Sequence, residues 1–232
     1  MRKFSVALAV LALSMLLAGG AFAGDDGGFY GSIKAGGSFL NASKSASTNS
    51  TTATGASSKF KTKDSLALGV AVGYNWMDMD LPIRTELEYM YHTDFKFQYA
   101  DSNSTLTNKI NLQTMMLNGY WDFYNSTSFT PYVNGGVGIA WVKESFSAGA
   151  ASGAGAAAIT APSSSTSTNF AFNVGAGVGW EMTESIILDL AYRYNYYGDG
   201  KRVTASGATN DITSQVKEIG THDVLLGLRY QF

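Results

Sequence analysis

The last twelve residues of the chain, 221–232 (THDVLLGLRYQF), alternate in character from one position to the next. One set of every second position reads His222, Val224, Leu226, Leu228, Tyr230 and Phe232, and the opposite set includes Asp223, Gly227, Arg229 and Gln231. A period of two residues predicts a β-strand with one apolar face. The strand runs to an aromatic last residue, so any fold for this chain has to place a regular strand there.

The same alternation recurs in seven earlier segments, residues 28–40, 65–76, 83–97, 109–123, 132–146, 169–180 and 186–197. Long polar connections (41–62, 98–107, 147–168 and 198–216) alternate with short ones (77–82, 124–130 and 182–185). In an up-and-down barrel this order gathers the long loops at one rim, and the short turns and both termini at the other. We therefore predict an all-β fold, an eight-stranded antiparallel up-and-down β-barrel.

The fourth predicted strand changes phase along its length. Ile110 and Leu112 do not fall on the face that carries Met115 and Leu117. An extra residue in one strand of a pair would restore the alternation, so we expect a β-bulge near residues 113–114.

Alternation alone does not separate a membrane barrel from a soluble one, because both have one apolar face. Here the second face is mainly Gly, Ala, Ser and Asn, and charged residues make up only 15% of the chain, against about 25% in soluble domains. Aromatic residues lie near the ends of the apolar face, with Trp76 and Trp180 by the short turns and Tyr194 and Tyr196 towards the long loops. This pattern is typical of membrane-interface girdles and favours a transmembrane β-barrel.

The first residues have the pattern of an export signal. Arg2 and Lys3 precede an apolar core at 6–17, and the small-residue sequence AFA follows at 21–23. We expect a cleaved signal peptide at 1–23 and a barrel domain at 24–232. Cysteine is absent, so stability has to come from strand pairing and packing. The net charge of -2 gives no reason to expect nucleic acid as a partner.

Several segments are similar to the small eight-stranded outer-membrane barrels of the opacity family porin type, relatives of the transmembrane domain of outer membrane protein A. The matching stretches are residues 29–31, 82–91 (PIRTELEYMY), 117–123 (LNGYWDF), 131–138 (PYVNGGVG), 175–180 (GAGVGW), 188–194 (LDLAYRY) and 225–232. The resemblance implies a Gram-negative cell outer membrane and contact with outer-membrane lipid and lipopolysaccharide. It also implies that the barrel assembly machinery recognises Leu228, Tyr230 and Phe232.

Charged residues on the second face are expected to point into the barrel, namely Lys34, Arg84, Glu86, Glu88, Asp189, Arg193 and Arg229. A Lys or Arg facing lipid near the membrane midplane would cost about 2 to 4 kcal/mol. Inside, opposite charges can pair into a polar network that closes the lumen. A water or ion path lined by the same residues is the alternative.

The two histidines, His92 and His222, lie towards the long-loop ends of their strands, near Asp94 and Asp223 respectively. Neither has a serine at an adjacent position, so we interpret them as rim residues and expect no catalytic, metal or cofactor site. The sequence thus favours a monomeric surface anchor whose four loops serve envelope integrity, adhesion, or recognition of host or cell-surface ligands. A small porin is the alternative function, and an outer-membrane enzyme or a soluble ligand-binding barrel is less favoured.

Overall fold

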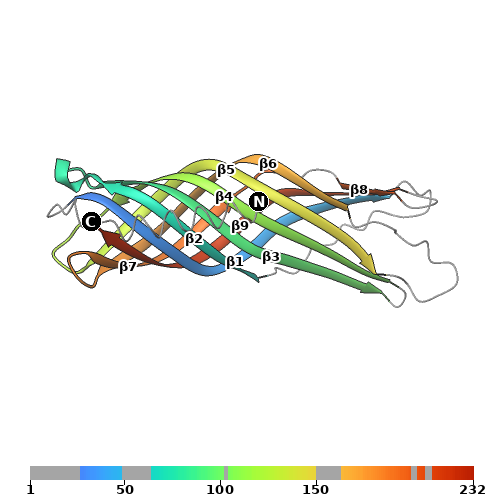
Figure 1. Cartoon of the computed structure of the whole chain (residues 1–232), viewed down its shortest axis with the longest axis horizontal. Coiled ribbons are helices and arrows are strands. Elements are labelled where there is room, and N and C mark those ends of the chain that lie inside the picture. The colour runs from blue at the N-terminus through green and yellow to red at the C-terminus, as the bar shows by residue number, and fades with distance from the viewer. Residues whose placement is uncertain (1–26, 49–63, 102–103, 150–162, 200–202, 207–210) are drawn as a thin grey trace.

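The computed structural model describes residues 27–48, 64–101, 104–149, 163–199, 203–206 and 211–232. The predicted signal peptide at 1–23 lies outside these residues. In chain order the elements are β1 (Gly28–Thr48), β2 (Asp64–Asn75), the 3-10 turn η1 (Trp76–Met79), β3 (Ile83–Asp101), β4 (Ser104–Asp122), β5 (Phe129–Gly149), β6 (Ser163–Glu181), β7 (Ile186–Tyr196), β8 (Val203–Ser206) and β9 (Asp211–Gln231). Figure 1 shows these strands winding together along one long axis.

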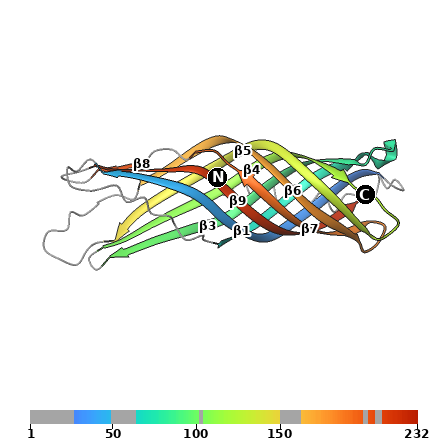
Figure 2. The ribbon, with the colours of Figure 1, turned by 180° about the vertical axis from the view of Figure 1, so that it is seen from behind.

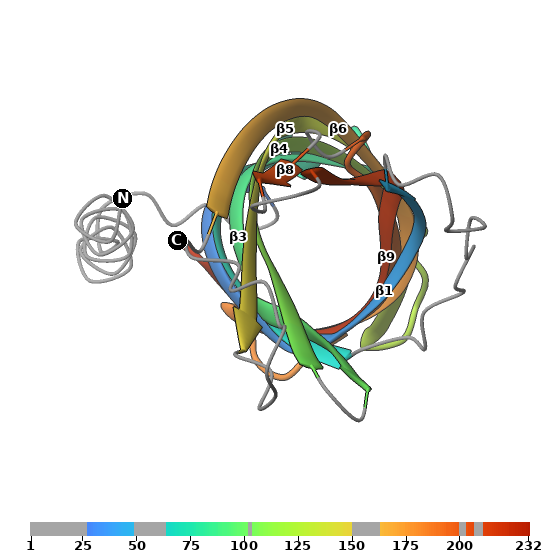
Figure 3. The same cartoon turned by 90° about the vertical axis from the view of Figure 1, so that its right-hand side faces the viewer.

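The strands form one closed antiparallel barrel. From β1 to β7 each strand pairs with the next along the chain, β7 pairs with β9, and β9 pairs back with β1, which closes the sheet. The pairing between β7 and β9 ends at Gly220, and the short β8 pairs with the part of β9 that precedes this residue, Asp211–Ser214. The strands β7 and β8 therefore occupy one position in the wall, one after the other. Figure 3, viewed along the barrel, shows the resulting ring. The prediction of an eight-stranded up-and-down barrel is confirmed.

The two ends of the barrel differ. The turn η1, the turns before β5 and β7, and the carboxyl terminus lie at one end, and β8 lies at the other, as Figures 1 and 2 both show. We call the first the short-turn end and the second the long-hairpin end. Short turns face the periplasm in outer-membrane barrels, which orients the molecule once its membrane is known.

Strands reach further towards the long-hairpin end than the sequence pattern predicted. β1 continues to Thr48, β5 to Gly149, and β3 pairs with β4 as far as Asp101 and Ser104. Parts of all four predicted long loops are therefore strand. These extensions are rich in Ser, Thr and Ala and lack an apolar period, but neighbouring strands still satisfy their backbone groups.

The predicted bulge near residues 113–114 is wrong. β4 pairs with β5 in unbroken register from Thr105 to Asp122, and the extra residue lies instead in β3, between His92 and Phe95. Ile110 and Leu112 point into the barrel, where they are 2% and 0% exposed. The apparent change of phase arises because the interior becomes apolar at that height, while the strand itself stays regular.

The outer wall carries the large apolar side chains. Among the most exposed are Phe170, Leu117, Phe29 and Leu226. In the half nearer the short-turn end the interior carries mostly small and polar residues, and glycines there leave room for inward tyrosine rings. A Cβ at Gly73 would lie 2.3 Å from the ring of Tyr30, and the chain therefore needs glycine there. Across the described residues no helix has the length and apolarity to span a membrane.

Candidate functional site

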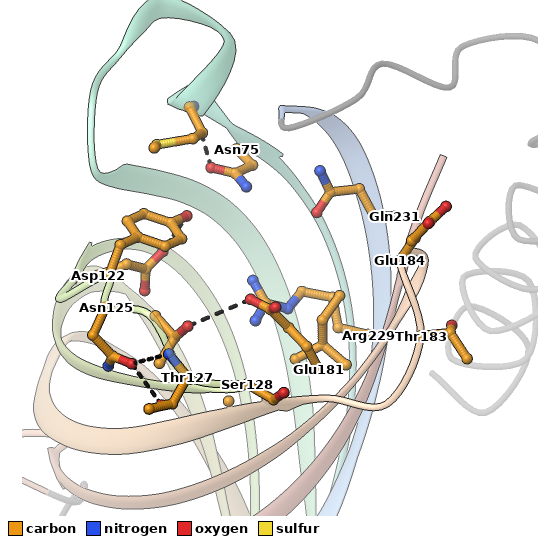
Figure 4. A pocket seen from close by; sticks show the side chains of 15 residues that line it. Asn75, Asp122, Asn125, Thr127, Ser128, Glu181, Thr183, Glu184, Arg229 and Gln231 are labelled. Carbon is orange, nitrogen blue, oxygen red and sulfur yellow. Dashed lines mark hydrogen bonds between the residues drawn. The ribbon is translucent and has the colours of Figure 1, made fainter.

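The interior of the barrel carries the polar residues that the sequence singled out, arranged in successive levels. At the short-turn end a cavity of about 490 Å³ opens between the turns, and we call it the vestibule (Figure 4). Its lining is mostly polar and includes Asn75, Asp122, Tyr124, Asn125, Thr127, Thr130, Glu181, Glu184, Arg229 and Gln231. Burial raises the pKa of Tyr124, and the negative charge of Asp122 acts in the same direction. The phenol therefore keeps its proton, and it donates a hydrogen bond to Asp122 Oδ2 at 3.4 Å.

Arg84 lies beyond the vestibule. Its Nε and Nη2 donate to the two carboxylate oxygens of Asp122 at 2.6 and 2.8 Å, a bidentate pair in which both side chains are almost fully buried. The guanidinium carbon lies 4.4 Å from the ring centroid of Tyr120 and 5.1 Å from that of Tyr132. The charge is thus neutralised by one partner and packed between aromatic rings.

A second set of charges crosses the lumen on the side of Arg84 that faces the long-hairpin end, and we call it the charge layer. Lys34 Nζ contacts Glu86 and Glu88 at 2.5 and 2.6 Å, and Arg193 Nη1 donates to the other oxygen of Glu88 at 2.5 Å. Tyr120 donates to Glu86 at 2.8 Å. The free space among these side chains is only about 10 Å³, which is at the lower limit for one water molecule.

Arg229 and Asp189 form a looser pair. Arg229 Nε lies 3.4 Å from Asp189 Oδ2, and Nη2 lies 3.5 Å from Oδ1. Both side chains are mostly buried, and the Arg229 guanidinium lies 5.5 Å from the ring centroid of Tyr30. The structure thus places all seven charges named from the sequence inside the barrel and brings four of them, Lys34, Glu86, Glu88 and Arg193, into one cluster.

Further towards the long-hairpin end, the lumen contains neutral polar groups and one isolated carboxylate in place of the ion pairs. Asn134 donates to Asn173, which donates in turn to Asn118. Asp223 then accepts hydrogen bonds from Ser38 at 2.5 Å and Asn195 at 2.8 Å, and it lies 3.3 Å from His92 Nε2.

The interpretation of His92 as a rim residue beside Asp94 is wrong. His92 is fully buried and meets Asp223 across the lumen, although β3 and β9 are not neighbours in the wall. The β3 bulge leaves Asp94 exposed. His222, in contrast, is on the outer wall, where its Nδ1 lies 2.6 Å from the hydroxyl of Tyr192, and it is not paired with Asp223 as its neighbour in the sequence suggested.

Towards the long-hairpin end the interior is filled by a cluster of buried, mostly apolar residues that we call the apolar layer. It consists of Leu40, Phe95, Ile110, Leu112, Met116, Ala140, Val142, Ala171, Tyr197 and Ile219. The prediction of a polar plug therefore describes only part of the interior. Two unlike barriers lie in series, a network of paired charges and a packed apolar plug.

The remaining residues named from the sequence lie on the outer wall or at its rim. Trp180 is 42% exposed and stacks on Phe129 near the short turns, while Trp76 donates from its indole to Thr85 at 3.0 Å. Tyr194 packs against His222, and Tyr196 against Phe172. Leu228 and Tyr230 are exposed, and the backbone N–H of Phe232 donates to Phe29 at 3.0 Å, which joins the end of the chain to β1.

Sequence reasoning missed the partners of several charges, above all Asp122, Asp223 and the three lumen asparagines. The alternation with a period of two could have shown that these side chains point inward. Asn118, Tyr120 and Asp122 occupy successive inward positions of β4. Their direction was ambiguous in the sequence because we expected a bulge in this strand. In the part of the chain that the structure describes, no group of three or more potential ligands could hold a metal ion.

Comparison with known proteins extends this picture. Residues 8–232 match the outer membrane protein beta-barrel domain family. Over 135 residues the chain is 32% identical to the outer membrane protein PagN of Salmonella typhimurium; this match covers 54% of the chain and 52% of PagN, so the chain spans about half the length of that relative.

Two solved structures have similar folds. Neisserial surface protein A has a TM-score of 0.52 at 20% identity, with 88% of this chain and 97% of that one covered. OprG from Pseudomonas aeruginosa has a TM-score of 0.55 at 16% identity, with 90% and 99% covered. The family match, the closed barrel and its apolar outer wall agree, and the chain belongs to the outer membrane protein beta-barrel domain family and resides in the outer membrane of a Gram-negative cell.

Proposed function

We propose that the protein is a closed outer-membrane anchor that presents its long hairpins to the outside of the cell. The observation that carries this proposal is the sealed lumen. Free space in the charge layer is about 10 Å³, and above it the apolar layer includes Phe95, Leu112 and Ile219, each 0% exposed. An ion would have to displace paired charges first and then pass tightly packed apolar side chains, where an unpaired charge is very costly.

The hairpins offer the surface through which such an anchor would act. The connecting segments 49–63 and 150–162 consist largely of Ser, Thr, Ala and Gly; they lie outside the described residues. Loops of this composition can change without disturbing a rigid barrel. We therefore favour adhesion or surface recognition, with host or cell-surface molecules as partners, over a role that depends on the interior.

The arrangement of polar groups supports the interpretation that the protein is not an enzyme. Ser38 and His92 both contact the same carboxylate, that of Asp223. A nucleophile needs its base as a direct partner, and here the acid lies between the two. The cluster is also buried in the lumen, where Ser38, His92 and Asp223 are each 0% exposed.

Current through single molecules in a planar bilayer tests the proposal. The mature protein is refolded in detergent, shown to be folded by its gel shift on boiling, and counted in the bilayer through a fluorescent label. We expect no discrete openings from verified insertions. Reproducible openings that change when Glu86→Gln or Arg229→Gln is introduced would overturn the closed anchor.

Such openings would identify a small porin, the second candidate. The feature that favours it is the vestibule of about 490 Å³ at the short-turn end, which ends at Arg229 and Asp122. The Arg229–Asp189 pair, at 3.4 Å, is longer than the ion pairs of Arg84 and Lys34, so these two charges hold each other less tightly at the inner side of the vestibule.

A further inference from the structure

The outer wall carries few positive charges among the residues whose side chains are described. Lys34, Arg84, Arg193 and Arg229 lie in the lumen, and only Lys109 and Lys143 are exposed. These two lysines are on adjacent strands, β4 and β5, in the half of the barrel nearer the long-hairpin end. A pair of outward lysines at one place on a mostly apolar wall calls for a physical reason.

The strand register brings the lysines together. Asn111 pairs with Lys143 and Lys109 pairs with Ser145, so Lys109 and Lys143 are diagonal neighbours on one face, with about 7–8 Å between such positions. Like charges at neighbouring positions on one face of a sheet repel each other, and an anion bound between them would remove that repulsion. Neither Lys109 nor Lys143 forms an ion pair with the described part of the chain.

The lysines lie at the upper limit of the apolar band. Trp141 precedes Lys143 by two residues on the same face, which is about 7 Å along the strand. A row of ordered polar groups lies beside Trp141 and Lys143, because Gln113 is the register partner of Trp141 and Asn111 that of Lys143. Gln113 accepts from Tyr89 at 3.0 Å, and Asn111 donates to Tyr91 and to Asp94, each at 3.1 Å. This row marks the transition from hydrocarbon to headgroups.

We propose that Lys109 and Lys143 bind a phosphate group on the headgroup of lipid A in the outer leaflet. The chemistry fits because Lys is a strong phosphate ligand that acts as a point charge, and because the site lies at headgroup depth beside aromatic rings that face the acyl chains. The phosphate supplies negative charge beyond that of Asp94, the exposed carboxylate that accepts from Asn111 beside the two lysines. This inference rests on the proposed orientation, in which the long hairpins face outward.

Native mass spectrometry of the full mature protein in detergent tests the proposal directly. Bisphosphorylated lipid A is titrated against the wild type, K109Q/K143Q, K109R/K143R and a control pair, T166Q/T168Q, on the exposed face of β6. Each lysine near an anionic surface contributes about 1 kcal/mol, so we expect about 30-fold weaker binding by K109Q/K143Q. The arginine pair should stay within about threefold of the wild type, and the control pair should match it.

Two comparisons identify the ligand and keep this test separate from that of the closed anchor. Lipid A without its phosphates should bind the wild type as weakly as intact lipid A binds K109Q/K143Q, and phosphatidylglycerol should not substitute for it. Equal binding by wild type and K109Q/K143Q, or equal binding of phosphatidylglycerol, would overturn the assignment. The gel shift on boiling verifies that each variant is folded, and channel activity has no effect on this readout.

Discussion

Arg84 illustrates how single residues determine the interior of this barrel. Removing a guanidinium from water costs several kcal/mol, and here a bidentate carboxylate and the faces of Tyr120 and Tyr132 offset that cost. The inward direction of Arg84 followed from the alternation of β3 and from the cost of a charge in lipid. The identity of its partner, Asp122, did not follow from the sequence, because one sequence does not specify which inward carboxylate of the neighbouring strand lies beside Arg84.

Replacing Arg84 alone should be strongly destabilising. Arg84→Ala leaves the Asp122 carboxylate buried without its partner, and we expect the free energy of unfolding to fall by about 3 to 5 kcal/mol. The double change Arg84→Met/Asp122→Leu removes both charges and should be much milder. Urea unfolding in lipid vesicles measures both. Equal losses for the single and double variants would mean that Arg84 acts mainly through its packing on the rings.

Glycines make a second residue-scale prediction with a matched control. A Cβ at Gly177 would lie 2.6 Å from the Tyr132 ring and 2.7 Å from the backbone oxygen of Leu190, whereas a Cβ at the outward Gly119 would meet nothing closer than 3.9 Å. Gly177→Ala should therefore cost about 1 to 3 kcal/mol in the free energy of unfolding. Gly119→Ala should stay within about 0.5 kcal/mol of the wild type, and the same unfolding assay compares the two.

At the scale of elements, β9 is the strand on which closure depends. It pairs with β1 on one edge and with β7 and β8 on the other. Period-two alternation located this strand and its direction correctly. It did not give the start of the strand, since the polar residues before 221 show no apolar face, nor the register shift opposite Asn41 and Ser43, where Glu218 takes a positive φ of 54°.

Deleting Phe232 should impair assembly more than it impairs stability. The deletion removes the Phe232–Phe29 backbone hydrogen bond and the ring that packs on Tyr230, and with them the terminal aromatic that the assembly machinery is expected to recognise. We expect several-fold less heat-modifiable protein in the outer membrane at matched expression. Phe123→Ala, which removes an exposed aromatic elsewhere on the wall, should leave that amount unchanged; an equal loss would refute the assembly role.

On the scale of the whole molecule, the interior closes by two mechanisms in series. The sequence predicted the charged part, because ionisable residues in strands have few alternatives to the lumen. It did not predict the apolar layer, because inward Ile110 and Leu112 look the same in a sequence as lipid-facing residues. Only the register, with the extra residue in β3, shows which way they point.

The two layers should therefore seal the barrel independently. Replacing the charge layer with apolar residues of similar size, as in Lys34→Met/Glu86→Leu/Glu88→Leu/Arg193→Met, should leave the barrel nonconducting, and so should Phe95→Gly/Leu112→Gly alone. Only the combination should carry current in a planar bilayer. Current from the first variant would show that the apolar layer is permeable by itself.

The length of the strands determines how far the barrel wall extends beyond the membrane. β5 has 21 residues, which at about 3.3 Å per residue and a tilt near 40° amounts to a height of roughly 50 Å, about twice that of the apolar band. The end of β5 at Gly149 is thus held roughly 25 Å clear of the hydrocarbon by a hydrogen-bonded wall. Antibodies, phages or receptors could reach the upper part of this wall over a layer of surface sugars that would cover a shorter barrel.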